Sequence, residues 1–351
     1  MATPSDDLIL EAGPGGGRRV TSRNVPRTLL LSRADIAALM SPADYLAAVE
    51  SGFRSARTGG ASAPPPMHIP GVGGGFHAKG ASLANGRKRV ALKLNGNFPG
   101  NPAKGLPTIQ GVILLCDAEN GAVLALLDSI EITLRRTAAA TALAARHLAR
   151  PDAATLTVIG CGAQARPQVE ALAEVLRFER GFVFDIDPDK AAALAAELGR
   201  ALDIRFDATP SLREATRASG VIVTCTTSRT PFLGIDDVAP GTFIAAVGAD
   251  NPEKSEIAPA LMARAKVVCD SLDQCLTMGD LHHATQAGLM TSDQVHAELG
   301  DVVAGIRPGR TGEEIAIFDS TGTALQDVAA AAAVYGRAVE RGEGTFFSFN
   351  A

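Results

Sequence analysis

The chain has 351 residues, 46% of them hydrophobic and 20% charged, and its formal net charge is −5. This composition is typical of a globular protein of about two domains and excludes a disordered chain. It also argues against a nucleic-acid partner, because the charge is acidic and the chain has no tryptophan to stack on bases.

Residues 1–26 are rich in glycine, proline, serine and charge, which predicts a flexible N-terminal tail. A short strand is expected at 27–31. Ser32, with Asp35 three residues later, should cap a first helix, and Ser41-Pro42 should begin a second that ends near residue 58. The Pro- and Gly-rich segment 59–75 is interpreted as a loop.

Strand patterns follow at 75–81, 89–94, 108–117 and 122–128, the last two joined by an Asn120-Gly121 hairpin turn. These segments predict a mostly antiparallel α+β unit, followed by an Ala-rich helix at 129–149. Beyond Pro151, short strands at 155–159, 182–184, 221–225, 242–247 and 266–269 alternate with helices. This alternation predicts an α/β fold with a Rossmann-type doubly wound parallel sheet. The helix at 323–341 should fold back onto the first unit to bury its apolar face.

The strongest local motif is Gly160-Cys161-Gly162-Ala163-Gln164-Ala165, directly after a strand and at the start of a helix. Gly160 permits the tight turn, Gly162 lets the backbone approach a pyrophosphate, and Ala165 allows close packing. Asp185 ends the next strand, where an acid binds the adenosine ribose. Because Asp185-Ile186-Asp187 lacks a basic residue, the motif favours NAD over NADP.

Three other positions suggest a cleft. Lys93 ends an apolar strand before a Gly/Asn-rich loop, where it is either a surface charge or a binding cation. One of the adjacent Arg135 and Arg136, inside an Ala-rich helix, should point inward toward an anion. Asp250 follows the strand at 242–247, at the sheet edge where ligands bind. It is either a general acid/base or a helix cap or loop acid.

Several motifs occur together in one order. They include Lys93 with Asn97-x-Pro99-x-Asn101, Gly105-Leu106-Pro107-Thr108, Leu134-Arg135-Arg136-Thr137, the glycine-rich turn, and Gly248-Ala249-Asp250-x-Pro252-x-Lys254-x-Glu256. In this order the chain resembles the ornithine cyclodeaminase/μ-crystallin family over about residues 28–340.

The resemblance implies roles for matching residues. Lys93 and Arg136 would hold the substrate carboxylate, and Asp250, with Lys93, would form the catalytic set. Cofactor contacts would come from Thr108, Thr137, Gly160, Gly162, Ala163, Gln164, Ala165, Asp185, Thr226, Ser228 and Lys254.

The family transfers hydride between NAD(P) and the carbon of an amino or imino acid, and its members form dimers or larger assemblies. The resemblance therefore implies a substrate-binding and dimerisation domain at 27–149 plus 323–351 and an NAD-binding domain at 150–322.

Two departures from the ornithine-deaminating members bear on the substrate. Met67 stands where those members have a carboxylate-binding arginine, and Lys79 stands where they have an acid for the distal ammonium. Lys79 either replaces the missing arginine, binds a second carboxylate, or faces solvent on its strand. The departures favour an NAD(H)-dependent reductase of a small imino or keto acid. A cyclodeaminase with tightly held NAD and a non-catalytic binding protein are the alternatives.

The five cysteines have no CxxC spacing and an odd count, which predicts neither a disulfide framework nor a metal site. No long apolar run suggests a membrane span, and the N-terminus lacks a signal-peptide core. We therefore expect a cytoplasmic homodimer that binds no nucleic acid, metal or membrane and acts on a small amino, imino or keto acid.

Overall fold

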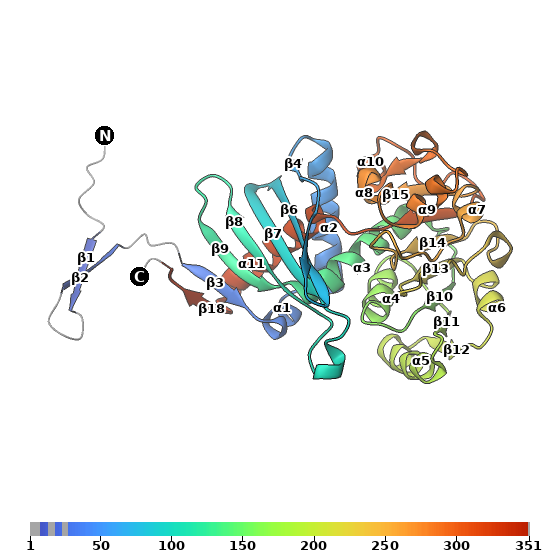
Figure 1. Ribbon diagram of the computed structural model, residues 1–351, viewed down its shortest axis with the longest axis horizontal. Helices are drawn as coiled ribbons and strands as arrows, with labels where there is room; N and C mark the ends of the chain where they lie inside the picture. Colours follow the sequence, from blue (N-terminus) through green and yellow to red (C-terminus); the bar gives the residue numbers. More distant parts are fainter. Residues whose placement is uncertain (1–7, 13–17, 23–26, 350–351) are drawn as a thin grey trace.

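The computed structural model describes residues 8–12, 18–22 and 27–349. Two lobes lie side by side, one built on a mostly antiparallel sheet and one on a parallel sheet (Figure 1). In these ranges no helix is both long and apolar enough to cross a membrane. The predicted flexible tail falls partly outside the described residues. Its described parts, β1 (Leu8–Ala12) and β2 (Arg18–Ser22), pair antiparallel, which the composition did not predict.

The first sheet has the strand order β18-β3-β9-β8-β7-β6-β4, with β5 also paired to β6. Among the described strands of this sheet, β3 and β9 form the single parallel pair. The strands are β3 (Thr28–Leu31), β4 (Ala61–Ser62), β5 (Met67–Gly71), β6 (Gly74–Asn85), β7 (Arg87–Asn97), β8 (Ile109–Asp117), β9 (Val123–Asp128) and β18 (Thr345–Phe347).

The prediction of a loop over 59–75 was wrong, because that segment contains β4 and β5. All five residues of β5 are exposed, so the strand carries no apolar alternation that could reveal it. Within the described part of the chain β5 pairs only with β6. Such an edge position tolerates Pro70, which lacks a donor for the ladder. The strand β6 is also longer than predicted, since it must span both edge partners.

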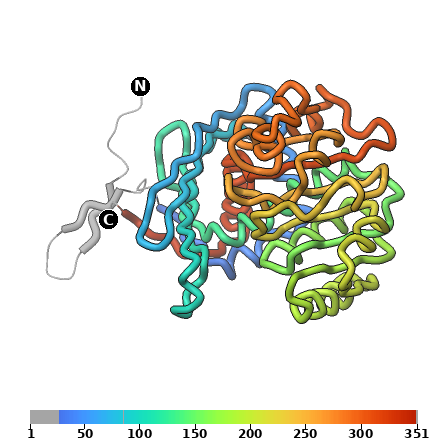
Figure 2. Tube along the Cα trace, turned by 45° about the vertical axis from the view of Figure 1, so that its right-hand side comes forward, coloured from blue at the N-terminus to red at the C-terminus, as the bar shows by residue number. Residues whose placement is uncertain are grey.

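Four helices belong to this lobe: α1 (Arg33–Leu39), α2 (Pro42–Arg57), α3 (Ser129–Leu148) and α11 (Ala324–Arg341). Ser32 and Ser41 form the capping boxes expected of them, with Asp35 and Asp44. The helix α11 returns from the other lobe and packs on β6, β7, α2 and α3 (Figure 1). Figure 2 shows the same crossing, with the red C-terminal chain passing from one lobe to the other.

The second sheet is entirely parallel, in the order β12-β11-β10-β13-β14-β17-β15-β16. Its strands are β10 (Thr155–Ile159), β11 (Arg180–Phe184), β12 (Arg205–Ala208), β13 (Val221–Thr224), β14 (Phe243–Ala246), β15 (Lys266–Cys269), β16 (Ala297–Glu298) and β17 (Ala316–Asp319). Chain order reverses between β10 and β13, which is the switch point where such sheets bind ligands. The predicted Rossmann-type fold is confirmed.

Helices cover this sheet on both faces: α4 (Ala165–Ala173), α5 (Pro188–Leu202), α6 (Leu212–Arg217), α7 (Pro259–Met262), α8 (Leu272–Cys275), α9 (Asp280–Gln286) and α10 (Leu299–Val303). The Ala-rich α3 joins the lobes, since it contacts α2 and α11 as well as α4 and β14. One apolar cluster accordingly contains Leu127 of the first sheet, Val158 of the second and Leu143 of α3. The lobes thus share a core, which fixes the site between them.

Candidate active site

The glycine-rich turn lies between β10 and α4, at the carboxyl edge of the parallel sheet. Gly160 has a φ of +94°, and a Cβ there would lie 2.9 Å from the carbonyl oxygen of Cys225, so only glycine fits. Around Gly162, in contrast, a Cβ would meet nothing within 4 Å. Ala165 is fully buried against the sheet. The turn therefore leaves open space beside Gly162 and the N-terminus of α4, as a pyrophosphate requires.

Asp185 lies at the end of β11 and faces this turn. Its carboxylate accepts hydrogen bonds from the backbone N–H of Cys161 at 2.7 Å and of Asp187 at 2.9 Å. Ile186 is fully exposed beside it, and the next basic side chain, Lys190, is paired with Asp187. The surroundings of Asp185 thus fit a ribose better than a 2′-phosphate.

Two lysines lie opposite each other on the antiparallel sheet. Lys79 on β6 and Lys93 on β7 are cross-strand partners, so both face the same side, toward α11. The surface-charge interpretation of Lys93 is excluded, because Lys93 is 5% exposed and its Nζ lies 2.7 Å from Asp327 Oδ2. Burial lowers the pKa of Lys93 to about 8, against the opposing effect of Asp327.

The adjacent arginines of α3 point in different directions. Arg136 is buried, with Nε 3.0 Å from Asp327 Oδ1 and Nη1 donating to Gln326 Oε1 at 2.8 Å. Arg135 instead forms ion pairs with Glu131 and Glu170 near the surface. Of the two, Arg136 is the inward arginine, as the family resemblance implied.

The segment that joins β17 to α11 organises these cations, and the sequence did not reveal it. Gly322 has a φ of +74°, and a Cβ there would lie 2.6 Å from Arg136 Nη1. Asp270, after β15, accepts from the Gly322 N–H at 2.6 Å and holds the Thr321 hydroxyl at 3.1 Å. Asp327 is fully buried between Lys93 and Arg136, whose charges lower its pKa despite burial. The sequence signal for this cluster was the pair Gln326-Asp327 at the start of an Ala-rich helix that was expected to pack on the first lobe.

Lys79 connects the two lobes through hydrogen bonds, and it forms no ion pair with the described residues. Its Nζ donates to the carbonyl oxygens of Gly322 at 2.7 Å and Thr321 at 3.3 Å, and to Gln274 Oε1 at 3.4 Å. The interpretation as a solvent-facing strand lysine is therefore wrong. Burial, then Arg136, lowers the pKa of Lys79, while the negative charges of Asp327, Asp270 and Asp250 raise it.

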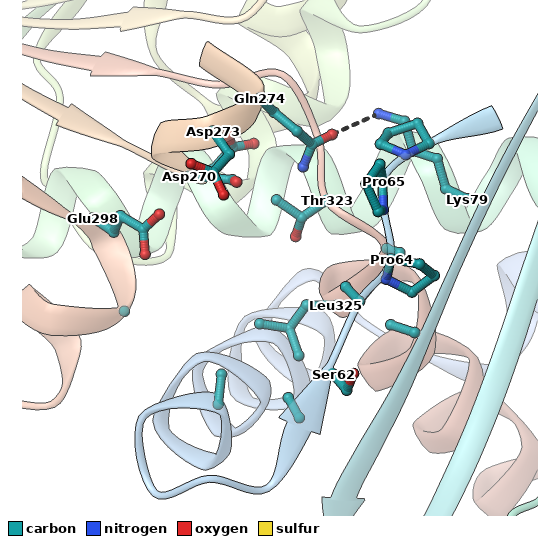
Figure 3. Close-up of a pocket in the computed structure, with 18 of the residues that line it drawn as sticks. Ser62, Pro64, Pro65, Lys79, Asp270, Asp273, Gln274, Glu298, Thr323 and Leu325 are labelled. Atoms are coloured by element: carbon teal, nitrogen blue, oxygen red, sulfur yellow. Dashed lines mark hydrogen bonds between the residues drawn. The ribbon is translucent and has the colours of Figure 1, made fainter. Parts of the chain in front are cut away.

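A cavity of about 580 Å³ opens beside Lys79, between the lobes. Figure 3 shows Gln274, Asp270, Asp273 and Glu298 on the side of the parallel sheet, facing Pro64, Pro65 and Lys79 on the other. The amide of Gln274 reaches across it to Lys79. Because the walls come from both lobes, a molecule bound here would touch both.

Asp250 lies on the loop after β14, at the same sheet edge as the glycine-rich turn. Its side chain is 56% exposed, and its Oδ1 lies 2.7 Å from Lys254 Nζ. Its negative charge raises the pKa of Lys79 on the other lobe. The loop therefore holds a carboxylate whose charge acts on Lys79 of the antiparallel sheet. Lys254, predicted to contact the cofactor, holds this carboxylate.

The other predicted cofactor residues lie on several elements. Thr226 and Ser228 follow β13, where the Thr226 hydroxyl accepts from the Ser228 N–H at 3.1 Å. Thr137 is buried one residue beyond Arg136 and donates to the Thr133 carbonyl. Ala163 is exposed and Gln164 half-buried in the turn after β10. Thr108 is half-buried and lies directly before β8.

One group of described residues has the donor types of a metal site, which the sequence did not predict. The buried Cys269, Cys275 and Asp319 have ligand atoms within 4.8 Å of one another. Both carboxylate oxygens of Asp319 already accept N–H groups at the start of α9, from Asp280 and Leu281. Through these hydrogen bonds Asp319 holds the start of α9 against β17.

Comparison with known proteins agrees with this geometry. Residues 27–342 match the family described as ornithine cyclodeaminase/mu-crystallin. The chain belongs to this family. The iminosuccinate reductase of Paracoccus denitrificans is 37% identical over 90% of this chain and 98% of its own.

Two solved structures of the family have nearly the same fold. An archaeal alanine dehydrogenase dimer with bound NAD has a TM-score of 0.88 and 36% identity, covering 92% of this chain and 99% of its own. A Thermococcus litoralis Δ1-pyrroline-2-carboxylate reductase with NADH and L-proline has a TM-score of 0.86 and 34% identity, covering 91% and 99%. Each is an enzyme of amino or imino acids, in agreement with the predicted class and cofactor.

Cyclodeaminases are also among the similar structures. A lysine cyclodeaminase that recognises L-lysine, L-ornithine and L-2,4-diaminobutyric acid has a TM-score of 0.80 and 29% identity, covering 92% of this chain and 96% of its own. The fold therefore supports a reductase and a cyclodeaminase alike, and the site residues must distinguish them.

Proposed function

We propose that this protein is an NAD(H)-dependent reductase, or dehydrogenase in the reverse direction, of a small imino or keto acid. One observation carries the proposal. Asp250, at the sheet edge beside the dinucleotide turn, acts electrostatically on the half-buried Lys79 of the other lobe, whose cross-strand partner Lys93 is buried beside Arg136 and Asp327. An acid facing a carboxylate-binding cluster is what an imino acid at a hydride-transfer site needs.

The open space at Gly162, the N-terminus of α4 and the Asp185 carboxylate fit the pyrophosphate and ribose of NAD. When bound, this cofactor supplies or accepts the hydride. Lys93 and Arg136 hold the α-carboxylate and so orient the α-carbon. Asp250 hydrogen-bonds the substrate nitrogen, stabilises its positive charge in the iminium and carries its proton.

Two nitrogens of the Arg136 guanidinium already interact with residues of α11. Asp327 and Gln326 occupy Nε and Nη1, while Nη2 has no partner among the described residues. The donors left for a substrate are Nη2 and the remaining protons of Lys93. Asp327 and Gln326 therefore fix the orientation of Arg136 before substrate arrives, which lowers the entropic cost of binding.

The cofactor preference follows from the end of β11. We expect NAD(H) to bind better than NADP(H), because a 2′-phosphate would face Asp185 without a basic partner. Exchanging Asp185 for Ser together with Ile186→Arg should shift the preference toward NADP(H). The measurement is the Kd of each reduced cofactor by nicotinamide fluorescence, with Ile186→Arg alone as the control, since Ile186 is fully exposed. A wild-type preference for NADPH of about tenfold, or roughly 1.4 kcal/mol, would contradict this assignment.

The substrate class follows from Lys79. A cation between the lobes repels the distal ammonium of ornithine and attracts a carboxylate, so neutral or acidic imino and keto acids are favoured. The test is a panel of keto acids with ammonia or amines, followed by NADH absorbance, alongside ornithine and lysine assayed for ammonia without added reductant. We expect NADH oxidation with the first set and little ammonia from the second. Efficient conversion of ornithine to proline without NADH would establish the cyclodeaminase instead. If the protein binds these ligands but is inactive in every assay, it is a non-catalytic binding protein.

A second copy of this chain is the proposed partner. Val90, Leu92 and Leu94 on β7 and Val112 on β8 are exposed on the sheet face opposite α11, where Leu94 and Val112 are cross-strand neighbours. Such an apolar face marks an interaction surface. The archaeal relative is a dimer. We propose a homodimer through this face, which light scattering would show as about twice 36.1 kDa.

We further propose the division into a domain at 27–149 plus 323–351 for substrate and dimerisation and one at 150–322 for NAD. The return of α11 to the first sheet supports it. All five cysteines are free thiols, which supports a reducing compartment, and we propose the cytoplasm. Fractionation of the source cells would test this location.

A further inference from the structure

Glu256 is a fully buried carboxylate with no role in the proposed chemistry so far. It lies eight residues after Gly248, between the ends of two strands of the parallel sheet. Its Oε1 accepts the Thr226 N–H at 2.6 Å. Its Oε2 accepts the Thr224 hydroxyl at 2.7 Å and the Gly248 N–H at 2.8 Å. One side chain thus binds the backbone of the loops after β13 and after β14.

The backbone beneath this carboxylate is itself fixed. The N–H groups of Glu256 and Ile257 donate to Asp280 Oδ1 at 2.8 and 3.0 Å. The carbonyl oxygen of Glu256 accepts from the N–H groups of Phe232 and Leu233. The backbone that carries the Glu256 side chain is therefore held in place. The loops that this carboxylate binds cannot move without breaking its hydrogen bonds.

The two loops carry different parts of the proposed site. Thr226 begins the segment expected to contact the cofactor, and Gly248 is two residues before Asp250, whose own N–H donates to the Gly248 carbonyl at 3.0 Å. A Cβ on Gly248 would collide with the Glu256 carboxylate and the Thr226 carbonyl, which explains the glycine. The cofactor loop and the acid loop meet at this carboxylate.

We propose that Glu256 is a positioning residue that ties the cofactor loop to the Asp250 loop, so that the hydride donor and the acid keep one relative position. This inference rests on the proposed function for its consequence in catalysis. The hydrogen bonds it invokes are independent of that function. The ionised carboxylate accepts all three hydrogen bonds, and its charge strengthens them. Protonation removes that charge and weakens the hold on the two backbone N–H groups.

The ionisation of Glu256 falls in an accessible pH range. Burial and the charge of Asp280 raise its pKa to about 7, against the hydrogen bonds from Thr224 and Thr226, which lower it. Thr224 and Thr226 face it from β13 and its loop, Gly248 from the loop after β14, and Asp280 from α9. Cys225, whose thiol pKa is raised by burial and by Glu256, is the other titratable neighbour. The tie is complete above about pH 7 and weakens as the pH falls through that value.

Glu256→Gln is the direct test, because the amide has the same shape but sets an N–H against either Thr226 or Gly248. We expect NADH to bind about tenfold more weakly and kcat to fall about tenfold, the effect of losing charged hydrogen bonds. The acid limb of the kcat profile near pH 7 should disappear, since the variant cannot ionise. The KM for the imino acid should stay within about twofold, because Glu256 contacts none of Lys79, Lys93 and Arg136.

Thr224→Val covers the case in which Glu256→Gln does not fold, since it removes one donor and keeps the shape. Thr157→Val is its matched control, because Thr157 is equally buried in the neighbouring strand and its hydroxyl pairs with Ser219 instead. We expect Thr224→Val to weaken NADH binding about threefold and Thr157→Val to leave it unchanged. Equal NADH affinities in these two variants, or a Glu256→Gln variant within twofold of wild type in NADH affinity and pH profile, would overturn the proposal. If wild type binds NADH but reduces no substrate, the proposed function fails while the NADH comparison still tests the tie.

Discussion

Asp250→Asn should reduce turnover by about 10²-fold or more, the usual contribution of a positioned acid or base. The asparagine keeps the size of the side chain and loses its charge and proton. It can still accept from Lys254 Nζ, which now lies 2.7 Å from Asp250 Oδ1, so the loop should keep its place. The iminium would lose the carboxylate that stabilises it, and the amine would lose its proton carrier.

The fold and NADH affinity should survive this substitution. Asp250 is more than half exposed, and the tie between its loop and the rest of the sheet runs through Gly248 and Glu256. Steady-state kcat, nicotinamide fluorescence and a thermal melt measure the three properties separately. Glu253→Gln is the matched control, since Glu253 is an exposed acid on the same loop and pairs with Arg229. Turnover of Asp250→Asn within a few-fold of Glu253→Gln would remove Asp250 from the mechanism.

The sequence predicted the parts of the fold that depend on local pattern. The strand at 155–159 and the strand at 266–269 occur with the predicted bounds, because buried parallel strands are short apolar runs between clear breaks. The edge strand β5 was missed, since its side chains are all exposed and its pairing is set by β6. The turn after β10 was recognisable because its conformation requires glycine locally, as the positive φ of Gly160 shows.

The site was predictable only in part, for a related reason. Arg136 could be named as a candidate from its place in an Ala-rich helix, and Lys93 and Asp250 from predicted strand ends. The prediction that Lys93 ends its strand was wrong, because β7 continues to Asn97, where it still pairs with β6 and β8. Asp327, the ion-pair partner of both Lys93 and Arg136, lies 191 residues after Arg136, and no spacing in the chain connects them. Glu256 was visible in a motif, yet its three donors come from the end of β13 and from the loops after β13 and β14. Such contacts exist only once the sheet has brought the strand ends together.

Arg136→Ala should reduce kcat/KM by about 10²-fold, because a charge-assisted hydrogen bond to a buried carboxylate contributes roughly 1.5–3 kcal/mol. NADH binding should change little, since Arg136 belongs to α3 and contacts Asp327, Gln326 and Gly322 rather than the dinucleotide turn.

The neighbouring Arg135 supplies the comparison for this prediction. Arg135→Ala removes ion pairs to Glu131 and Glu170 that lie near the surface, and such pairs contribute only about 0–1 kcal/mol. It should therefore lower stability slightly and leave kcat/KM nearly unchanged. Arg136→Lys guards against a folding defect in Arg136→Ala, because it keeps a cation beside Asp327 and loses the planar fork. We expect its kcat/KM to fall between those of wild type and Arg136→Ala, with the wild-type melting temperature nearly kept. Equal, small losses in the Arg135 and Arg136 variants would show that the substrate carboxylate binds elsewhere, whereas a loss confined to the Arg136 variants places it between Lys93 and α3.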